Sequence, residues 1–442
     1  MHQSKSSPNP TVISDFYKRF PYPKVDRVEY DFNLVDHFHY LAGSCPQYNL
    51  GQKQPQRRGR MLIAGCGTRE AVMWAFSLPH FDIDAIDISE NSLNISKHLA
   101  QQLELTNINF IHGNFEYGEG IKGPYDFIHS YGVLHHLENP ERGLSHLENA
   151  LAPNGLMSIM VYNDANRIPL QRAQRLINLL TQNAPEETRE DLAHRLVERG
   201  AHTSNRLRSV FQRAFGEIKD NPQQFADTML NPREVSYTIP SLVQFLKSSD
   251  LELVSPALPV HWKAQSHLTK EQQEVFSKLP LIEQMEVCDH LDGPLFWVLA
   301  QRSSEQSQLR PCVIDSELFW KLVPMPLMTG RFPVDELRLK SPREINVFIE
   351  RIDHNLVSIS RGKGGTSFLY HQIAKTILAH IDGKKSLREI AHLACEQEEI
   401  AFEDIEKSLL TMLHEFIDVL ALATPDYSHC THCPTRCSNE RI

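Results

Sequence analysis

Two glycines and a carboxylate are the first residues of this chain whose types and spacing could do chemistry. Gly65 and Gly67 flank Cys66 in a turn that directly follows the apolar run MLIA at 61–64. Glycines in such a turn let the backbone bend sharply and approach a ligand closely. Asp87 follows about twenty residues later, at the end of a second apolar run, where its carboxylate can accept hydrogen bonds from a ribose. The pattern therefore predicts a site for a ligand that contains a nucleoside.

The elements that must position these residues are alternating strands and helices. The apolar runs predict strands at 61–64, 83–86, 107–112, 124–130, 156–162, 251–256 and 294–301. Periodic segments predict helices at about 69–78, 89–105 and 140–151, the last ended by turn residues at 153–155. Such alternation is typical of a parallel sheet with right-handed crossovers. The predicted fold class is therefore α/β, with a seven-stranded Rossmann-like sheet.

Two segments outside this sheet are candidates to cover the ligand site. Residues from about 165 to 235 become helical and charged, which predicts a helical insertion. Near the N-terminus, Pro21 and Pro23 flank Tyr22 and predict a stiff, extended segment with exposed aromatic side chains from Phe16 onward. That segment either packs across the domain surface or forms a lid over the site.

Composition and charge restrict the classes of partner. The chain has 442 residues and a net charge of -10, which argues against a general nucleic-acid-binding surface. No apolar run reaches the roughly 18 residues of a membrane span, and residues 1–20 lack the apolar core of a secretory signal. Most of the eight cysteines are scattered. We therefore expect a cytoplasmic protein with mostly free thiols and no membrane segment.

In combination, these motifs make residues 1–302 resemble the class I S-adenosylmethionine-dependent methyltransferases, and within them a bacterial subgroup with an N-terminal PYP segment. The resemblance is carried by LIAGCGT at 62–68, DIS at 87–89, IHGNF at 111–115, YDFIHSYGVLHHL at 125–137, LAPNGL at 151–156 and YTIP at 237–240. It implies S-adenosyl-L-methionine as the cofactor. The cofactor contacts that it implies are Gly65, Cys66, Gly67, Asp87, Ile88, Asn114, Phe115 and Tyr131.

Three positions depart from the pattern of that family. Ile63 stands where members usually carry an acid that helps to orient the first loop, and Arg69 replaces a third glycine. Arg69 can begin the following helix or approach the carboxylate of the cofactor's methionine part. Asn114 replaces the aspartate that reads the adenine, although its amide can still accept and donate hydrogen bonds.

The chemistry that the resemblance implies needs alignment more than acid–base catalysis, because a sulfonium donor is already activated. A base is needed only where the acceptor must lose a proton. His135, in the loop at 130–136 where acceptors of the family lie, is the candidate base. Alternatively, His135 and its neighbour His136 serve packing and hydrogen bonding. Residues 162–164, which end the fifth strand, could contact an acceptor or cap the loop.

The last part of the chain reads as a separate auxiliary domain at 312–424, which follows a polar linker at 303–311. Strand-like alternation at 337–359, a turn at 361–366, helical segments at 368–380, 386–396 and 402–416 and a short strand at 417–424 predict a small α+β unit. The D-G-x-x-S-L turn at 382–387 is similar to winged-helix domains that bind leader peptides in peptide-modifying enzymes. A structural or dimerising role and nucleic-acid docking are the alternatives.

The tail at 425–442 contains a C-x2-C-x3-C pattern with two histidines nearby. Cys430, Cys433 and Cys437 could hold zinc or an iron–sulfur cluster, with His429 or His432 as a fourth ligand. Free or redox-active thiols are the alternative.

Three functions fit the sequence. The first is methylation of a peptide or protein side chain that the C-terminal domain docks. The second is methylation of a small metabolite, with the C-terminal domain forming a homodimer. The third is a non-catalytic protein that binds S-adenosylmethionine or a partner. The identity of the methyl acceptor is left open.

Overall fold

The computed structural model describes most of the first 303 residues and shorter pieces of the remainder. The described ranges are 10–25, 29–31, 59–78, 81–257, 262, 264, 267–293, 295–303, 320–321, 323–326, 331–333, 349–353, 356–359, 366–369, 376–377, 380, 385–406 and 420–423. They divide into two compact units. The first comprises the described parts of Met1–Asp26, Gly59–Val72 and Asp82–Glu305, and the second those of Arg27–Arg58, Met73–Phe81 and Gln306–Ile442.

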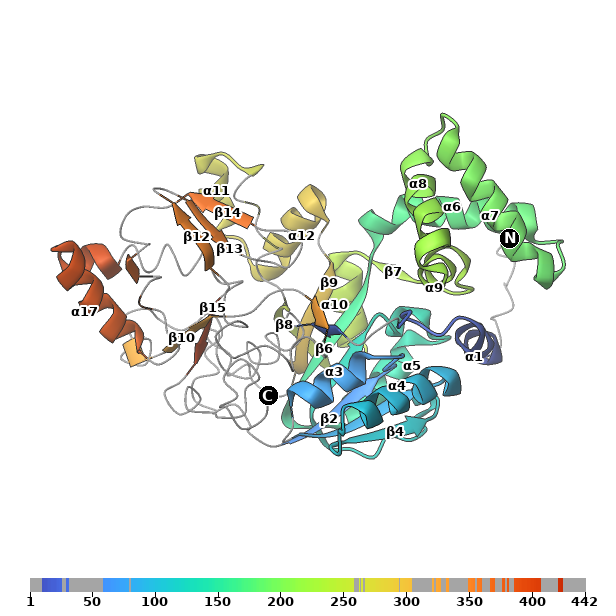
Figure 1. Cartoon of the computed structure of the whole chain (residues 1–442), viewed down its shortest axis with the longest axis horizontal. Coiled ribbons are helices and arrows are strands. Elements are labelled where there is room, and N and C mark those ends of the chain that lie inside the picture. The colour runs from blue at the N-terminus through green and yellow to red at the C-terminus, as the bar shows by residue number, and fades with distance from the viewer. Residues whose placement is uncertain are drawn as a thin grey trace. The chain divides into compact units, whose positions relative to one another are not determined.

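A mixed sheet of eight strands organises the first unit (Figure 1). Its strands are β2 (Gly59–Ala64), β3 (Phe81–Asp87), β4 (Ile108–His112), β5 (Tyr125–Tyr131), β6 (Leu151–Asn163), β7 (Ser236–Tyr237), β8 (Leu251–Pro256) and β9 (Phe296–Arg302). The order is β4-β3-β2-β5-β6-β9-β8, with β7 beside the end of β6. β5 is parallel to β2 and β6, whereas β9 is antiparallel to its neighbours β6 and β8.

The predicted α/β sheet is therefore confirmed, with β7 as an eighth strand that the sequence did not predict. The turn expected at 153–155 lies within β6, where the pairing with β5 shifts register between Tyr125 and Phe127. A backbone bend can be absorbed as an irregularity of this kind, so the strand continues through it.

Helices follow the strands at the predicted places. They are α3 (Glu70–Ser77), α4 (Glu90–Gln102), α5 (Pro140–Asn149), α10 (Ile239–Lys247), α11 (Lys270–Phe276) and α12 (Leu281–Asp292), with short turns η2 (Phe115–Tyr117) and η3 (Leu134–His136). Ser89 caps α4 by accepting a hydrogen bond from the Ser92 N–H. Thr238 caps α10 in a capping box with Ser241. Among the described residues, no helix is long and apolar enough to cross a membrane.

The N-terminal segment differs from its prediction. Residues Pro10–Arg19 form helix α1, so the expectation of an extended chain from Phe16 was wrong for its first part. Pro10 occupies the first helical position, where proline is favoured because it needs no N–H partner there. Phe16 and Phe20 are four residues apart, and their ring centroids lie 5.3 Å apart, as packing along one helix face requires.

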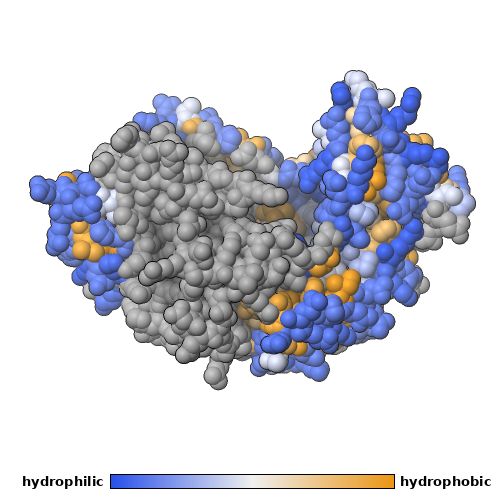
Figure 2. Space-filling view, viewed as in Figure 1, coloured by the Kyte–Doolittle hydropathy of each residue, from blue (hydrophilic) through white to orange (hydrophobic). Residues whose placement is uncertain are grey.

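The helical insertion lies between the end of β6 and β7, as predicted. It contains α6 (Asp164–Thr181), α7 (Glu186–His202), α8 (Arg208–Asp220), α9 (Pro222–Phe225) and the π-helix η4 (Ala226–Leu230), which gather beyond the sheet in Figure 1. The insertion has its own hydrophobic core, made of Ala173, Ile177, Ala193, Val197, Ala201, Phe211, Ala214, Phe225 and Met229. Apolar patches also reach its surface in Figure 2, and its exposed apolar residues include Leu179 and Leu180.

The sheet and its helices enclose a separate core. Its members include Leu62, Ile86, Ile128, Leu144, Ile159, Leu242 and Phe296. The apolar run of β2 is buried from Met61 through Ala64, because helices cover both faces of a central parallel strand.

The second unit contains small antiparallel sheets and one long helix within its described part. β12 (Ile349–Asp353), β13 (Leu356–Ile359) and β14 (Thr366–Leu369) form a three-stranded sheet. β1 (Glu29–Asp31) pairs with β11 (Arg331–Pro333), and β10 (Val323–Pro326) pairs with β15 (Leu420–Ala423). Helix α17 (Leu387–Glu398) begins with a capping box of Ser386 and Glu389.

The outcome for the predicted auxiliary domain is mixed. The short last strand and the helix near 386–396 are confirmed, whereas the helix expected from 368 begins with strand residues of β14. Residues 361–365 of the predicted turn lie outside the described residues, and Thr366 is the first residue of β14. The winged-helix arrangement and the limits of the domain stay predictions.

Candidate active site

The glycine turn after β2 has a backbone that only glycine adopts readily. Gly65 and Gly67 have φ angles of +77° and +56°. The N–H groups of Gly65 and Cys66 donate to the Ile86 carbonyl of β3 over 2.8 and 3.0 Å. A Cβ on Gly67 would lie 2.7 Å from the Tyr22 carbonyl oxygen. The turn is therefore held tightly against β3 and the N-terminal segment.

Asp87 lies at the end of β3 with its carboxylate facing this turn. One oxygen accepts a hydrogen bond from the Gly67 N–H, and the other accepts one from the Ser89 N–H, each over 2.8 Å. Burial raises the pKa of Asp87 above its ordinary value, although the two backbone N–H groups act in the opposite direction. Because a carboxylate has about four lone-pair sites, each oxygen retains one for a ligand hydroxyl. Two adjacent ribose hydroxyls fit that capacity.

The other predicted cofactor contacts lie around the same edge of the sheet. Asn114 caps η2 through its side-chain oxygen, which accepts the Glu116 N–H over 3.0 Å. Ile88 and Tyr131 are half-buried at the ends of β3 and β5. Phe115 is 4% exposed and belongs to the hydrophobic core, so it supports the loop from beneath.

Cys66 is a buried residue of the turn rather than an exposed thiol. Burial raises its pKa well above the ordinary value, with smaller contributions from the charges of Asp87 and Glu70. A thiol that stays protonated is a poor nucleophile, so its place in the turn explains Cys66 better than reactivity does.

The N-terminal segment connects this cofactor edge with the helical insertion. Thr68 donates its backbone N–H to the Tyr22 carbonyl and its hydroxyl to the Pro23 carbonyl, over 3.2 and 2.6 Å. The Ser89 hydroxyl donates to the Tyr17 carbonyl over 3.2 Å. From the other side, the Tyr22 hydroxyl donates to the side-chain oxygen of Gln224 in α9 over 2.8 Å. These contacts fit both interpretations of the segment, so the lid stays a prediction beside packing across the domain surface.

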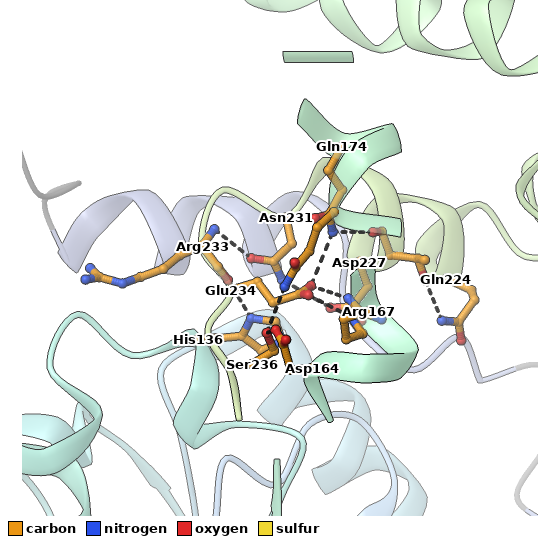
Figure 3. A network of polar contacts seen from close by, with 12 residues as sticks. His136, Asp164, Arg167, Gln174, Gln224, Asp227, Asn231, Arg233, Glu234 and Ser236 are labelled. Atoms are coloured by element: carbon orange, nitrogen blue, oxygen red, sulfur yellow. Dashed lines mark hydrogen bonds and ion pairs between the residues drawn. The ribbon is translucent and has the colours of Figure 1, made fainter. Parts of the chain in front are cut away.

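Asp227 belongs to a polar network between α1, α6 and the π-helix η4 (Figure 3). One of its carboxylate oxygens accepts hydrogen bonds from the Tyr17 hydroxyl over 2.9 Å and from the Asn231 amide over 3.3 Å. The other carboxylate oxygen has no hydrogen-bond partner among the described residues. Asp227 is only 4% exposed. Its second oxygen is therefore available to a ligand.

Three tyrosines surround this carboxylate, and we call them with Asp227 the acid–tyrosine cluster. They are Tyr17, Tyr22 and Tyr162, and the charge of Asp227 contributes to a raised pKa in each. Desolvation is the largest cause in all three and raises the pKa of Tyr22 to about 12. The hydroxyls therefore stay protonated at neutral pH and can donate hydrogen bonds.

The candidate base His135 lies beneath this cluster. Its ring is fully buried, with its centroid 3.8 Å from that of Tyr162 and 4.2 Å from that of His136. Neither ring nitrogen has a partner among the described residues. Burial lowers its pKa well below the ordinary value, so the imidazole is neutral. The catalytic role of His135 stays a prediction, whereas His136 has a structural contact, because its Nδ1 lies 2.6 Å from the Arg233 carbonyl oxygen.

The residues that end β6 have divided roles. Asn163 is buried and donates to Asp289 over 2.5 Å, while Asp164 accepts the Ser236 hydroxyl over 2.5 Å. Asn163 therefore ties β6 to α12, and Asp164 ties the start of the insertion to β7, while acceptor contact by these two residues stays a prediction. Tyr162 remains a candidate for acceptor contact, with the Arg167 guanidinium 3.8 Å from its ring centroid.

Sequence reasoning missed Asp227. It lies about ten positions before the quoted YTIP motif, in a segment that reads as one more charged helix. The π-helical turn that carries it has no clear sequence signature, although such turns occur frequently at functional sites.

The predicted metal site lies outside the described residues, as do all three of its cysteines. Within the described part of the chain, no group of three His, Cys, Asp or Glu side chains could hold a metal ion. Zinc or iron–sulfur binding by the tail stays a prediction.

Comparison with known proteins agrees with this geometry. Residues 62–157, which include the glycine turn, Asp87 and the loop after β5, match the family described as a methyltransferase domain. The chain contains a methyltransferase domain. The chain is also 29% identical over 246 residues to the uncharacterized protein syc1184_c of Synechococcus sp., which is 54% of this chain and 58% of that protein. The match thus spans less than two thirds of this relative.

Two solved structures share the fold of the methyltransferase chain. PKMT2 from Rickettsia typhi aligns with a TM-score of 0.64 at 13% identity, over 91% of this chain and 77% of PKMT2. The same protein in complex with AdoHcy gives a TM-score of 0.63 at 12% identity, over 89% of this chain and 75% of that chain. At such identities, the likeness establishes a common fold.

Proposed function

We propose that the chain is an S-adenosylmethionine-dependent methyltransferase that acts on a cationic nitrogen of a peptide or protein side chain. The cofactor part rests on the glycine turn and on Asp87, whose spare lone pairs fit the two ribose hydroxyls. The acceptor part rests on one observation, the buried carboxylate of Asp227 with a partnerless oxygen among tyrosines.

A buried anionic oxygen favours a cation as its ligand. Leaving a carboxylate desolvated without a partner is costly, and a charge-assisted hydrogen bond from an ammonium or guanidinium offsets that cost. Tyrosine rings strengthen the preference, because the faces of aromatic rings attract cations. A neutral hydroxyl or an anionic carboxylate as the acceptor would gain less from the acid–tyrosine cluster.

The same groups can carry out the proton transfer that a nitrogen acceptor needs. When bound, S-adenosylmethionine supplies a methyl group activated on a sulfonium. Asp227 can hold the protonated nitrogen and take up its proton, which frees the lone pair of the nitrogen. The nitrogen then bonds to the methyl carbon while the carbon–sulfur bond breaks and its electron pair stays on sulfur. Tyr17 stabilises the carboxylate through its hydrogen bond to Asp227.

Docking of a peptide by the C-terminal part is the remaining element of the proposal. Its support is the antiparallel strands β12–β14 and the α17 helix, which are elements that can receive an extended peptide at a sheet edge.

The test uses the whole chain with S-adenosylmethionine and a set of synthetic peptides. Each peptide carries one lysine, arginine, histidine, glutamate or glutamine in the same neutral context, and mass spectrometry detects the added methyl group. Methylation of the lysine or arginine peptides is expected. Methylation only of the glutamate or glutamine peptides would refute the cationic acceptor.

Two controls separate the alternatives. If free cationic metabolites are methylated much faster than the peptides, the small-metabolite function replaces the proposal. If folded protein gives no binding heat with S-adenosylmethionine, both enzymatic functions fail. The remaining function is then that of a non-catalytic protein that binds a partner and has lost the cofactor site.

A further inference from the structure

A chain of buried polar side chains crosses the sheet beneath the glycine turn. Glu70 is the first residue of α3, and its carboxylate lies 2.6 Å from Nε2 of His129 in β5. Nδ1 of His129 lies 3.1 Å from the Ser158 hydroxyl in β6. Nε1 of Trp297 in β9 donates to that hydroxyl over 2.7 Å. We call these four residues the Glu70 relay.

The partners of the Glu70 relay fix the direction of its hydrogen bonds. The indole N–H of Trp297 can only donate, and an ionised Glu70 carboxylate can only accept. Trp297 therefore donates to Ser158, and Nε2–H of His129 donates to Glu70, while the direction between Ser158 and Nδ1 of His129 depends on the tautomer. The polar atoms named here thus all have hydrogen-bond partners within the Glu70 relay.

The Glu70 relay is not a hydrolytic site, although a serine, a histidine and an acid follow one another in it. Ser158 and His129 have no exposed surface, so no substrate reaches the hydroxyl. The relay therefore acts on the protein itself.

Its position connects it to the cofactor loop. Glu70 directly follows the turn that contains Gly65 and Gly67, whose positive φ angles are ones that glycine adopts readily. Ile63, in β2 just before that turn, is the last residue of β2 that pairs with β5, and its partner there is His129. Glu70 thus ties the far end of the turn to the strand beside its near end. The charge of Glu70 also contributes to the raised pKa of Cys66 within the turn.

We propose that Glu70, held by His129, is a positioning residue that fixes the glycine turn in the conformation that binds the cofactor. The expected effect on cofactor binding rests on the proposed function, whereas the expected effect on the order of the turn in ligand-free protein does not. In the absence of the Glu70–His129 contact, the turn samples other conformations, and the cofactor has to select the competent one at a cost in affinity.

The test combines four variants of the full chain. Glu70→Ala removes the carboxylate, and Glu70→Gln keeps an acceptor oxygen without the charge. His129→Gln retains a donor near the position of Nε2 and so keeps the contact with Glu70. His129→Asn places its amide nearer the position of Nδ1 and keeps the contact with Ser158 instead. His129→Asn removes one methylene more than His129→Gln from the buried site, so Glu70→Ala, which leaves the imidazole in place, is the variant that separates the Glu70 contact from general loss of packing.

A matched control is available in Glu148, which forms an ion pair with Arg302. The side chains of Glu148 and Glu70 are both 15% exposed. Glu148→Gln breaks that ion pair at the start of β6, at the edge of the sheet opposite the glycine turn. It reports what loss of a partly buried ion pair does to the protein without the relay.

The first readout is hydrogen exchange of the Gly67 and Thr68 amides in ligand-free protein. Their N–H groups bond to Asp87 and to the Tyr22 carbonyl, so opening of the turn exposes them. Exchange at least tenfold faster is expected for Glu70→Ala and His129→Asn, with near-wild-type exchange for His129→Gln and Glu148→Gln. Equal exchange in wild type and in all five variants overturns the proposal, whatever the cofactor does.

The second readout is the Kd for S-adenosylhomocysteine by calorimetry, together with the KM for the best acceptor. Glu70→Ala and His129→Asn are expected to raise the Kd about tenfold, with Glu70→Gln between them and wild type and the acceptor KM unchanged. A similar rise in His129→Gln or Glu148→Gln would assign the effect to general destabilisation and reject the proposal. If wild type itself does not bind, the proposed function fails, and the exchange experiment still decides the role of Glu70.

Discussion

Replacement of Asp87 by alanine should weaken cofactor binding by about two orders of magnitude. Each oxygen of this carboxylate accepts one backbone N–H and has one further lone pair directed to the ligand side. Two charge-assisted hydrogen bonds to ribose hydroxyls contribute about 1.5 kcal/mol each, or about 3 kcal/mol together. Since about 1.4 kcal/mol corresponds to tenfold, the expected rise in Kd is roughly 100-fold.

Asp84 provides the control, because it is an aspartate of the same strand with the same exposed fraction of 9%. Its carboxylate accepts hydrogen bonds from Arg60, Tyr125 and Asn109, all away from the glycine turn. Asp84→Asn should therefore lower the free energy of unfolding while leaving the Kd within about twofold of wild type.

The assay is calorimetric titration of each folded variant with S-adenosylhomocysteine at neutral pH, with urea unfolding of the same samples. The comparison distinguishes lost ligand contacts from lost stability. An unchanged Kd in Asp87→Ala would show that this carboxylate does not hold the ribose. An equal loss of affinity in Asp84→Asn would show that disturbance of β3 explains the effect.

Three further outcomes follow from the same contacts. Asp227→Asn should reduce methylation of a cationic peptide about 30-fold, because about 2 kcal/mol of charge-assisted contact is lost, and should leave the Kd for S-adenosylhomocysteine unchanged. The control is Asp220→Asn, at an exposed position. Equal activity of the two variants would contradict the acceptor site. Gly67→Ala should lower the free energy of unfolding by about 1–3 kcal/mol, because alanine is strained at the positive φ of Gly67. Gly216→Ala should raise the free energy of unfolding by about 0.5–1 kcal/mol, because a Cβ at Gly216 meets no atom within 4 Å. Urea unfolding in which both variants change alike would contradict this. Because burial raises the pKa of Asp87, its carboxylate should become protonated at a higher pH than an ordinary aspartate, and cofactor binding should weaken as the pH falls below neutral. Calorimetry at a series of pH values should show this loss in wild type and not in Asp87→Ala. The same pH dependence in the variant would assign the titration to another group.

The sequence predicted the sheet well because its strands are short apolar runs with strong turn residues between them. β3, β4 and β8 lie within two residues of their expected ranges. The buried strands of a parallel sheet need continuous apolar residues, and such runs can be recognised directly in the amino-acid sequence. β7 was missed because two residues give no periodicity.

The acceptor side could not be predicted in the same way. Tyr17, Tyr162 and Asp227 come from α1, the end of β6 and η4, and their proximity depends on how the insertion folds back over the sheet. Tyr17 and Asp227 are 210 positions apart, so no local spacing connects them. The Glu70 relay escaped for the same reason, since each of its residues taken alone reads as an ordinary member of a strand or helix.

The two hydrophobic cores of the methyltransferase unit share no residue. Substitutions in the core of the insertion can therefore accumulate without a matching change in the core of the sheet, because distant sites contribute to stability nearly independently. Asp227 belongs to the insertion, whereas Asp87 belongs to the sheet. Under the proposed function, replacing residues 164–235 as a block would change acceptor preference and leave Asp87 in place, provided that the contacts of Tyr17 with Asp227 and of Tyr22 with Gln224 are kept.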